Sequence, residues 1–364
     1  MKITFFIGSL SGGGAERVVC NLSNFLIEKG HDISVLTVGK ADNRYYIDER
    51  VKVSSLETEK RIKFYPLRVL VKMARLKKRL KNDGVDLFVA LLPETISALM
   101  RLKRLIKSPV IVCERNSPEF YGKSTVKDML KRFKAAEGAV FQTEEIKNFY
   151  SEKISLKSFK VIPNAVNPEF ILPPFNGERR KTVISVGRHN AQKNFDLLIS
   201  AFAEVSKDFP EYTLEIYGKG ELTQEYKAQC GKLGITDKVM FCGFCDNVKE
   251  KLYGADLFVI SSDYEGVPNA LIEAMALSTP CVSTDFSGGG ARALIENGKN
   301  GLLVKMGDKA GLVAAMKRVL SDRVFAEKLA VNANKITEKL SPEKIYGEWE
   351  EYFRSVIRAS GNEI

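Results

Sequence analysis

Short apolar runs alternate with longer stretches of helical periodicity from one end of the chain to the other. Runs such as Ile3–Ile7 and Leu257–Ser261 have the length of buried strands, whereas Ala15–Lys29 and Phe195–Lys207 carry their apolar residues on one helical face. Apolar strands that alternate with helices are typical of parallel sheets covered on both faces. Because the pattern occurs twice, the sequence predicts an α/β protein with two doubly wound domains.

The remaining elements follow the same alternation. Further strands are expected at Ile33–Val38, Asp86–Leu92, Val110–Cys113, Ala139–Gln142, Lys160–Ile162, Val183–Val186, Leu214–Tyr217, Val239–Phe241, Cys281–Thr284 and Leu302–Val304. Further helices are expected at Ser124–Lys134 and Asn269–Leu277.

The domain boundary is expected between Pro163 and Pro174, where proline is frequent and helical periodicity lapses. This gives a first domain over residues 1–165 and a second over residues 166–340. Residues 341–364 are expected to hold a final helix, since Ser341-Pro342 is typical of an N-cap followed by proline at the first helical position. One face of that helix is expected to pack in the core, because it carries Tyr346, Trp349, Tyr352, Phe353 and Ile357.

Composition narrows the class of protein. The chain has 364 residues, 45% of them hydrophobic, which suits a globular protein and excludes a disordered chain. Its apolar runs are shorter than the ~20 residues that cross a bilayer, and no signal peptide is expected, so a cytoplasmic location is predicted. The six cysteines are scattered and read as reduced, and the lone pair Cys242 and Cys245 is not expected to hold a metal.

Charge is divided unequally between the two halves. The chain carries a net charge of +11, and residues 1–165 hold 31 Lys and Arg against 18 Asp and Glu. Between Lys60 and Lys81 there are ten basic residues and no acidic one, with apolar positions at Leu67, Leu70, Val71, Ala74 and Leu80. Such an amphipathic basic helix suits an anionic membrane surface or a lipid diphosphate, although a solvated basic face is the simpler alternative.

Candidate chemistry lies in the loops that follow strands, because ligands of open parallel sheets bind beyond the carboxyl ends of the strands. Gly12-Gly13-Gly14 follows the first strand, which leaves a tight turn or an anion or sugar site as alternatives. Gly187-Arg188-x4-Lys193 follows a strand of the second domain and can direct two cations at one anion.

The loop from Ser261 to Asn269 is the most informative. Pro268 suits the first turn of a helix, which would leave the amides of Gly266 and Val267 at its positive end. Glu265 precedes that helix and Glu273 lies in its second turn, too far apart to share a proton but well placed for two groups of one extended ligand. The loop Gly288-Gly289-Gly290 indicates only a tight turn.

Taken together, these motifs resemble family 4 retaining glycosyltransferases of the GT-B type, over essentially the whole chain. The residues that carry the resemblance are Gly12-Gly13-Gly14-Ala15-Glu16-Arg17, Gly187-Arg188-x4-Lys193, Glu265-x7-Glu273 and Asn300-Gly301-Leu302-Leu303-Val304. The resemblance implies two Rossmann-like doubly wound domains facing a central cleft. The start of the chain and Glu114-Arg115-Asn116 are similar to bacterial enzymes that add hexoses or N-acetylhexosamines to polyprenyl-diphosphate-linked glycans.

The resemblance also implies a role for each matching position. Arg188 and Lys193 would hold the donor diphosphate, Glu273 the ribose, and Glu265 the transferred sugar. Arg188, Lys193 and Glu265 are the expected catalytic residues; the other expected donor-binding residues are Gly14, Gly187, Phe244, Gly266, Val267, Pro268, Asn269 and Glu273. The expected acceptor-binding residues are Gly13, Glu114, Arg115, Arg68, Lys72 and Arg75.

The partners that follow are a nucleotide sugar, most simply UDP-linked, a polyprenyl-diphosphate-linked saccharide and the inner face of the plasma membrane. No cofactor or metal is expected, since the two cations can stabilise the departing diphosphate. Many relatives carry histidine where this chain has Arg115, which cannot act as a base but can bind an acceptor phosphate. Glu114 is then either an acceptor contact or the partner of Arg115, and His189 a further candidate at the site.

Three alternatives compete with this interpretation. A sugar-nucleotide epimerase or a phosphorylase would keep the fold, but the paired cations and glutamates favour transfer. A nucleic-acid-binding protein would suit the basic charge, yet only Phe64 and Tyr65 lie among the basic residues as aromatic side chains. A catalytically inactive scaffold is disfavoured because all four expected polar residues are present.

Overall fold

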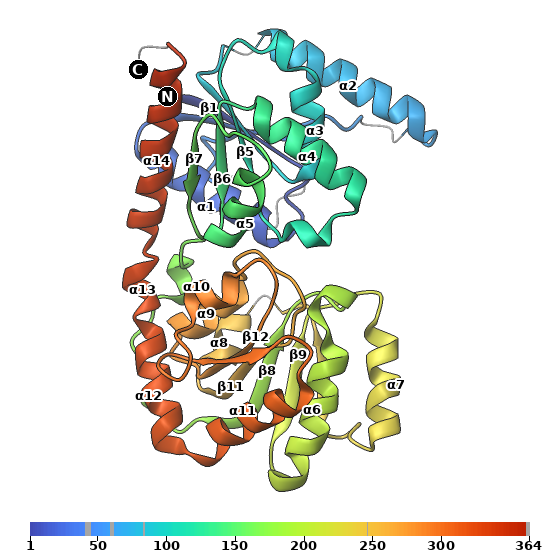
Figure 1. Ribbon diagram of the computed structural model, residues 1–364, viewed down its shortest axis with the longest axis vertical. Helices are drawn as coiled ribbons and strands as arrows, with labels where there is room; N and C mark the ends of the chain where they lie inside the picture. Colours follow the sequence, from blue (N-terminus) through green and yellow to red (C-terminus); the bar gives the residue numbers. More distant parts are fainter. Residues whose placement is uncertain (41–44, 59–61, 83, 246, 362–364) are drawn as a thin grey trace. The chain divides into compact units, whose positions relative to one another are not determined.

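The computed structural model describes residues 1–40, 45–58, 62–82, 84–245 and 247–361 (Figure 1). The chain divides into two compact units, and the first is made of Met1–Ala165 together with Pro342–Ile364. The second unit is Val166–Ser341. The divisions therefore fall at residues 165 and 341, compared with expected boundaries at 165 and 340.

The first unit is built on a seven-stranded sheet in the order β3-β2-β1-β4-β5-β6-β7, and every pairing among its described strands is parallel. Its strands are β1 (Lys2–Ile7), β2 (Asp32–Thr37), β3 (Lys52–Ser55), β4 (Leu87–Leu91), β5 (Val110–Cys113), β6 (Gly138–Phe141) and β7 (Phe159–Val161). Its helices are α1 (Gly14–Glu28), α2 (Tyr65–Asn82), α3 (Pro93–Arg101), α4 (Lys123–Ala135), α5 (Glu144–Ser151) and α14 (Pro342–Ala359).

Strand β3 was not predicted. It lies at the edge of the sheet, and none of its four residues is fully buried. Because an edge strand of this kind has no buried face, its sequence lacks the apolar run that identifies the other strands.

The final helix α14 packs on the first unit through the face that the sequence predicts. The rings of Phe25 in α1 and Tyr346 in α14 lie 5.4 Å apart, and the Tyr352 hydroxyl accepts a hydrogen bond of 3.1 Å from the Ala139 amide. The predicted core positions of this helix are buried, including Trp349 at 1% exposure. One turn after Tyr346, Glu350 of the same helix binds His31 at 3.0 Å.

The second unit holds a six-stranded sheet in the order β10-β9-β8-β11-β12-β13, again parallel in every described pairing. Its strands are β8 (Arg180–Val186), β9 (Thr213–Tyr217), β10 (Val239–Gly243), β11 (Ala255–Ile260), β12 (Cys281–Asp285) and β13 (Leu302–Lys305). Its helices are α6 (Phe195–Asp208), α7 (Thr223–Leu233), α8 (Val248–Leu252), α9 (Asn269–Ala276), α10 (Gly290–Leu294), α11 (Lys309–Ser321), α12 (Arg323–Asn334) and α13 (Ile336–Lys339).

Both sheets reverse direction next to their first strand. In the first unit the chain winds outward from β1 through β2 to β3 and then returns to place β4 on the other side of β1. In the second unit it winds from β8 through β9 to β10 and returns with β11. The strand pairs β1/β4 and β8/β11 are therefore topological switch points, where loops diverge at the carboxyl edge and ligands of such sheets bind.

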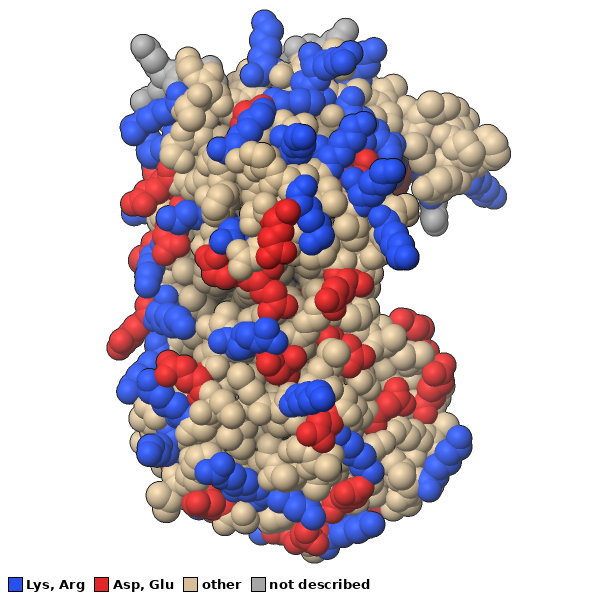
Figure 2. Space-filling model, in the orientation of Figure 1, with Lys and Arg blue, Asp and Glu red and all other residues tan. Residues whose placement is uncertain are grey.

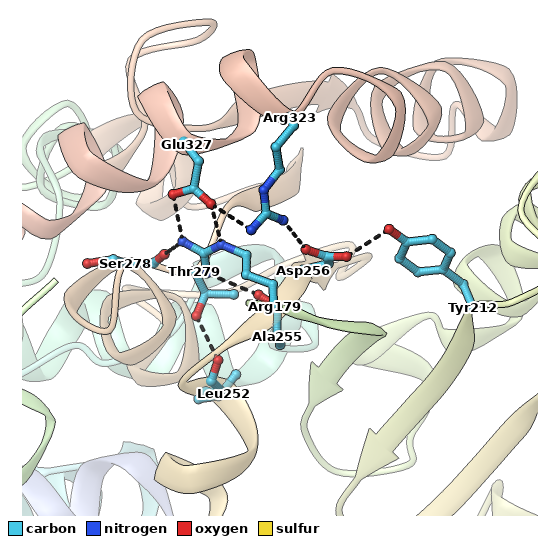
Figure 3. Close-up of polar contacts among 9 residues, drawn as sticks. All are labelled: Arg179, Tyr212, Leu252, Ala255, Asp256, Ser278, Thr279, Arg323 and Glu327. Carbon is cyan, nitrogen blue, oxygen red and sulfur yellow. Dashed lines mark hydrogen bonds and ion pairs between the residues drawn. The ribbon is translucent and has the colours of Figure 1, made fainter. Parts of the chain in front are cut away.

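The opposite, amino edge of the second sheet is held by a buried arginine (Figure 3). Arg179 has a fully buried side chain, and its guanidinium binds Glu327 of α12 at 2.8 Å. It also donates to the carbonyls of Ala255 at 3.2 Å and Ser278 at 2.8 Å. Ser278 adopts a φ of 57°, a conformation that is rare for a non-glycine residue, and the bond from Arg179 holds its carbonyl in place.

We expect Arg179→Ala to lower the free energy of unfolding of the second unit by about 3 kcal/mol, because it leaves two buried carbonyls without their donor. Urea unfolding followed by far-UV circular dichroism measures this change. The control is Lys181→Ala, which removes an exposed ion pair with Glu211 and should cost less than about 0.5 kcal/mol. Equal stabilities for the two variants would contradict the role given to Arg179.

Candidate functional site

The loops that follow β8 and β11 are bonded to each other at the switch point of the second unit. Gln192 donates from its side chain to the Tyr264 carbonyl at 2.9 Å, and its own carbonyl accepts from the Asp263 amide at 3.0 Å. The Ser261 hydroxyl donates to the Lys193 carbonyl at 2.9 Å. The two motifs singled out in the sequence, 68 to 72 residues apart, thus form one structural site.

Lys193 and Glu265 form an ion pair at the centre of this site. Lys193 Nζ lies 2.5 Å from Glu265 Oε1, and the two side chains are only 16% and 12% exposed. The same carboxylate oxygen accepts a hydrogen bond of 3.0 Å from the Ser262 hydroxyl. An ammonium group has three donors, so this pair fixes the position of Lys193 and leaves further N–H groups for a ligand.

Asn194 fixes the end of the first loop. It takes a left-handed backbone conformation with a φ of 45°, and its side chain donates to Asp263 at 2.8 Å. Its side-chain oxygen accepts from the Leu197 amide at 3.2 Å, which makes it the N-cap of α6. One asparagine therefore starts the helix and ties the two loops together.

Arg188 is the cation of this site that the protein leaves to solvent. Its side chain is exposed, and it forms no ion pair or hydrogen bond with any side chain in the described part of the chain. Gly187, just before it, lies against Lys193: a Cβ atom there would lie 2.8 Å from Lys193 Cε, so a side chain would displace the lysine. On the other side Gly218, with a φ of 134°, packs against the Gly187 carbonyl so closely that its own Cβ would lie 1.8 Å away.

His189 does not reach the site, contrary to its place among the candidates. It is 1% exposed and lies edge-on to the rings of Phe195, Tyr226 and Phe241. Its Nδ1 pairs with the Thr223 hydroxyl at 2.8 Å, and burial lowers its pKa. A buried neutral imidazole of this kind supports the loop from behind and touches no ligand.

The helix that carries Glu273 begins at Asn269, as expected, but Pro268 lies just before its first turn. Pro268 is the N-cap of α9 and not its first residue, so the helix starts at Asn269. Gly266, Val267 and Pro268 are buried, and so is Glu273, at 4% exposure. The Gly266 carbonyl packs against Gly290 of α10, where a Cβ atom would lie 1.8 Å from it. The loop before α10, for which the sequence indicated only a tight turn, therefore supports the glutamate loop.

Phe244 lies at the carboxyl end of β10, two strands from β8 in the sheet. Its ring is 45% exposed and follows Gly243, whose φ of 69° turns the chain there. Cys242 and Cys245 flank this turn. Among the residues that the structure describes, no group of three His, Cys, Asp or Glu side chains is placed to hold a metal ion.

In the first unit, the glycine loop leads into α1. Gly12 has a φ of 117°, Gly13 is the N-cap and Gly14 begins the helix. A Cβ atom on Gly13 would lie 2.1 Å from a carboxylate oxygen of Glu16, which Ser9 binds at 3.3 Å. The φ of Gly12 explains why this turn needs glycine there. The close contact at Gly13 is with the end of the flexible Glu16 side chain.

Glu114 is neither an exposed acceptor contact nor the ion-pair partner of Arg115. It is 1% exposed, and its carboxylate accepts hydrogen bonds of 2.7 Å from the hydroxyls of both Tyr121 and Tyr150. The amides of Arg115 and Asn116 donate to it as well. Burial raises its pKa, against the lowering effect of these hydrogen bonds. Since every side of the carboxylate is engaged, Glu114 shapes the end of β5 and leaves no surface for a ligand.

Arg115 is a buried cation without a carboxylate partner in the described residues. Its Nη2 donates to the side-chain oxygen of Asn164, which also accepts from Gln142 at 2.9 Å. Its Nε and Nη1 atoms are buried and make no hydrogen bond to a described residue. Burial lowers the pKa of Arg115 to about 10, so the group stays charged at neutral pH. Buried guanidinium N–H groups without hydrogen-bond partners favour an anionic ligand near them.

The cations expected on α2 divide into two groups. Lys72 pairs with Glu57 at 2.7 Å, and Arg75 donates to the Glu57 carbonyl at 2.5 Å, so both hold α2 to the segment after β3. Arg68 lies over the Tyr65 ring at 5.3 Å. Lys60 and Arg61 of the same basic stretch lie outside the described residues.

The apolar face of α2 also differs from the expected one. Leu76 and Leu80 are buried, at 0% and 5% exposure, whereas Leu67 and Leu70 are 47% and 66% exposed. Only the second half of the helix therefore packs on the unit. The first half projects from it, as Figure 1 shows.

Comparison with known proteins places the chain in a family. Residues 12–170 match the model of Glycosyltransferase Family 4, and residues 169–336 match the model of Glycosyl transferases group 1. The chain belongs to these glycosyltransferases and has their GT-B fold, which confirms the resemblance and excludes the nucleic-acid-binding alternative.

Two relatives from Campylobacter jejuni are similar over most of their length. One, 31% identical over 96% of this chain and 97% of its own, is named GalNAc-alpha-(1->4)-GalNAc-alpha-(1->3)-diNAcBac-PP-undecaprenol alpha-1,4-N-acetyl-D-galactosaminyltransferase. The other, 30% identical over 88% of this chain and 90% of its own, is an N-acetylgalactosamine-N,N'-diacetylbacillosaminyl-diphospho-undecaprenol 4-alpha-N-acetylgalactosaminyltransferase. HepE from Anabaena, solved with UDP and glucose, shares the fold at a TM-score of 0.85, with 18% identity over 98% of this chain and 100% of its own.

Gly290→Ala tests whether the two glycine contacts hold the site. The added methyl group would meet the Gly266 carbonyl, so we expect a loss of about 2–4 kcal/mol in the stability of the second unit, measured by urea unfolding. Gly347→Ala is the matched control: it is also helical but has open space around its Cβ position. That change should be neutral or stabilise by up to about 1 kcal/mol. A neutral Gly290→Ala would contradict the packing described.

Proposed function

We propose that the enzyme is a retaining glycosyltransferase that moves a hexose or N-acetylhexosamine from a UDP-sugar to a polyprenyl-diphosphate-linked glycan. The product would enter a bacterial surface polysaccharide or glycoprotein glycan. The pairing of Lys193 with Glu265 at the switch point carries the proposal, with Arg188 in the same loop as Lys193 and Glu273 on the helix that follows the Glu265 loop. The names of the two Campylobacter relatives and the UDP bound to HepE support the choice of acceptor and donor.

In this proposal the donor binds to the second unit. The exposed Arg188 and the oriented Lys193 hold the diphosphate, and the amides of Gly266, Val267 and Asn269 lie beside its β-phosphate. The family resemblance gives Glu273 the ribose hydroxyls, Glu265 the transferred sugar and Phe244 the base. Gly187 has no side chain, so the backbone there can come close to the phosphates. The resemblance also gives Gly14 a role in donor binding and Gly13 a role in acceptor binding.

The reaction requires stabilisation of the negative charge that develops on the departing diphosphate. The bond between the sugar carbon and the diphosphate oxygen breaks, and an acceptor oxygen forms the new bond to the same carbon on the same face. The acceptor proton passes to the departing phosphate, which carries the growing negative charge. Fixed cations aimed at that charge lower the barrier, so Arg188 and Lys193 can act without a divalent metal.

The first unit would bind the acceptor. Its positive charge suits a lipid diphosphate, and Arg115 has two buried guanidinium nitrogens without a hydrogen-bond partner among the described residues. On α2, Lys72 and Arg75 are engaged with the Glu57 segment, so Arg68 and the exposed Lys63, Lys77 and Lys78 are the stronger candidates for phosphate contacts. Glu114 positions the chain that carries Arg115.

The projecting half of α2, with the residue just before it, is the candidate membrane contact. Phe64 precedes the helix and is 68% exposed, and within the helix Tyr65 is 65% and Leu70 is 66% exposed. Figure 2 shows Lys and Arg side chains crowded over the first unit on the face in view. Large exposed apolar side chains next to cations are typical of a helix that lies in the interface of an anionic membrane. Within the described residues, none of the helices is long and apolar enough to cross a bilayer. We therefore infer a peripheral location on the inner face of the plasma membrane.

The donor site is tested by thermal stabilisation with UDP, GDP, ADP and CMP. We expect UDP at ~100 times its Kd to stabilise the wild type by about 2.7 kcal/mol, seen as a rise in Tm. Arg188→Ala should lose most of this rise and reduce transfer about 10²–10³-fold, because its charge serves the leaving diphosphate.

Lys181→Ala removes an exposed cation elsewhere in the same unit and should change neither value. Transfer should also continue in excess EDTA. A rise with another nucleotide alone would overturn the choice of UDP, and inactivation by EDTA would overturn metal independence.

Membrane binding is tested by co-sedimentation with phosphatidylcholine vesicles that contain phosphatidylglycerol. Changing Lys63, Arg68, Lys77 and Lys78 together to Gln should weaken binding about 10²–10³-fold, since each charge near such a surface contributes about 1 kcal/mol. The control changes Lys181, Lys227, Lys232 and Lys328 of the second unit to Gln, with the same loss of net charge. Equal binding by the two quadruple variants would contradict a role for α2.

A further inference from the structure

A carboxylate that the sequence motifs do not include lies at the switch point of the first unit. A Cβ atom on Gly8, directly after β1, would lie 3.4 Å from Glu94 Oε1. On the other side Gly39, after β2, donates from its amide to the Gly8 carbonyl at 2.8 Å. The chain segments that follow three adjacent strands, β2, β1 and β4, therefore meet at Gly8, and Glu94 lies beside them.

The turn that carries Glu94 has a strained backbone. Leu92 has a φ of 76°, a region that non-glycine residues rarely occupy, and Pro93 follows it as the first residue of α3. The Thr95 hydroxyl bonds to the Leu91 carbonyl and lies 3.0 Å from the Leu92 carbonyl, which holds the turn. Strain of this kind persists where the surrounding structure enforces it, and it is concentrated at functional sites. Here it places Glu94 in the first turn of α3.

Glu94 is an exposed carboxylate in a basic part of the chain. It forms no hydrogen bond or ion pair with a described residue, although it lies in the half of the chain where Lys and Arg greatly outnumber Asp and Glu. Some other carboxylates of the unit are engaged, such as Glu57 with Lys72 and Glu137 with Lys103. The neighbouring Tyr121 hydroxyl is directed to Glu114.

The chemistry of a free carboxylate selects the kind of ligand. Its oxygens only accept hydrogen bonds, so it binds hydroxyl groups strongly and repels phosphate. A sugar offers several hydroxyl donors on one ring. The cations of α2 and Arg115 are suited to the lipid diphosphate, and Glu94 is suited to the uncharged part of the same acceptor.

We propose that Glu94 accepts hydrogen bonds from hydroxyls of the acceptor's terminal sugar and determines which sugar is accepted. This inference rests on the proposed function, because it assigns the acceptor to the first unit. It adds a residue that determines specificity to that site.

The test compares Glu94→Gln with the wild type in transfer to a polyprenyl-diphosphate disaccharide ending in N-acetylgalactosamine. UDP-N-acetylgalactosamine, UDP-N-acetylglucosamine, UDP-galactose and UDP-glucose are each offered as donor. We expect the KM for the acceptor to rise roughly 10- to 100-fold, the usual effect of a lost charged hydrogen bond. The UDP-induced rise in Tm and hydrolysis of the donor without acceptor should not change.

Two comparisons separate recognition from structural support. Glu152→Gln, an exposed glutamate after α5, should leave every value unchanged. Monodeoxy analogues of the terminal sugar provide the second comparison. With the wild type, the analogue that lacks the hydroxyl bound by Glu94 should raise the acceptor KM by the same factor as Glu94→Gln does with the complete sugar. With Glu94→Gln, the same analogue should raise the acceptor KM little further.

The outcomes are distinguishable. An unchanged acceptor KM in Glu94→Gln, or equal losses with the deoxy analogue in both proteins, overturns the role of Glu94 alone. A wild type that binds UDP but does not transfer to this lipid acceptor overturns the proposed acceptor class, and the inference with it. A wild type that shows neither UDP binding nor transfer overturns the proposed function as a whole.

Discussion

The parallel pairing of β8 with β11 is the constraint on which the second unit depends. Because parallel strands end at the same edge, this pairing brings the loop of Arg188 and Lys193 against the loop of Glu265. The chain continues from β8 toward β9 and β10 on one side and from β11 toward β12 and β13 on the other, so the loops after β8 and β11 lead in opposite directions. At its opposite edge, Arg179 ties the starts of the same strands to α12. The sheet thus has a fixed amino edge and a carboxyl edge that carries the loops of the candidate site.

The charged side chains at the carboxyl edges of the two sheets differ in their partners. In the second unit a cation and a carboxylate are paired, and that pairing orients Lys193 while Arg188 remains exposed. In the first unit the buried Glu114 accepts hydrogen bonds from two tyrosines and two amides, and none from the Arg115 guanidinium. Burial of a cation without hydrogen-bond partners is unfavourable, and an anionic ligand that binds to it offsets this free energy. This physical asymmetry agrees with a donor diphosphate in one unit and an anionic acceptor in the other.

Glycines shape both edges by permitting contact between backbones. Gly218 packs against Gly187, and Gly290 packs against Gly266, at separations that no side chain could tolerate. The loops that carry the candidate catalytic groups are thus supported by loops that carry none. This explains the glycine run before α10, which by itself indicated nothing more than a turn.

The sequence by itself determined the fold class, the two-domain organisation and the motifs of the donor site. These properties are local: apolar runs, helical periodicity and a few polar residues after strands are readable in one stretch of chain. Only the tertiary structure decided which polar groups face a ligand. Burial removed Glu114 and His189 from that role, and packing showed which half of α2 is exposed. The pairing of Lys193 with Glu265 and the approach of Glu94 to Gly8 join residues more than 70 positions apart. Such contacts follow from the order of strands in the sheet, which the pattern along the chain does not contain.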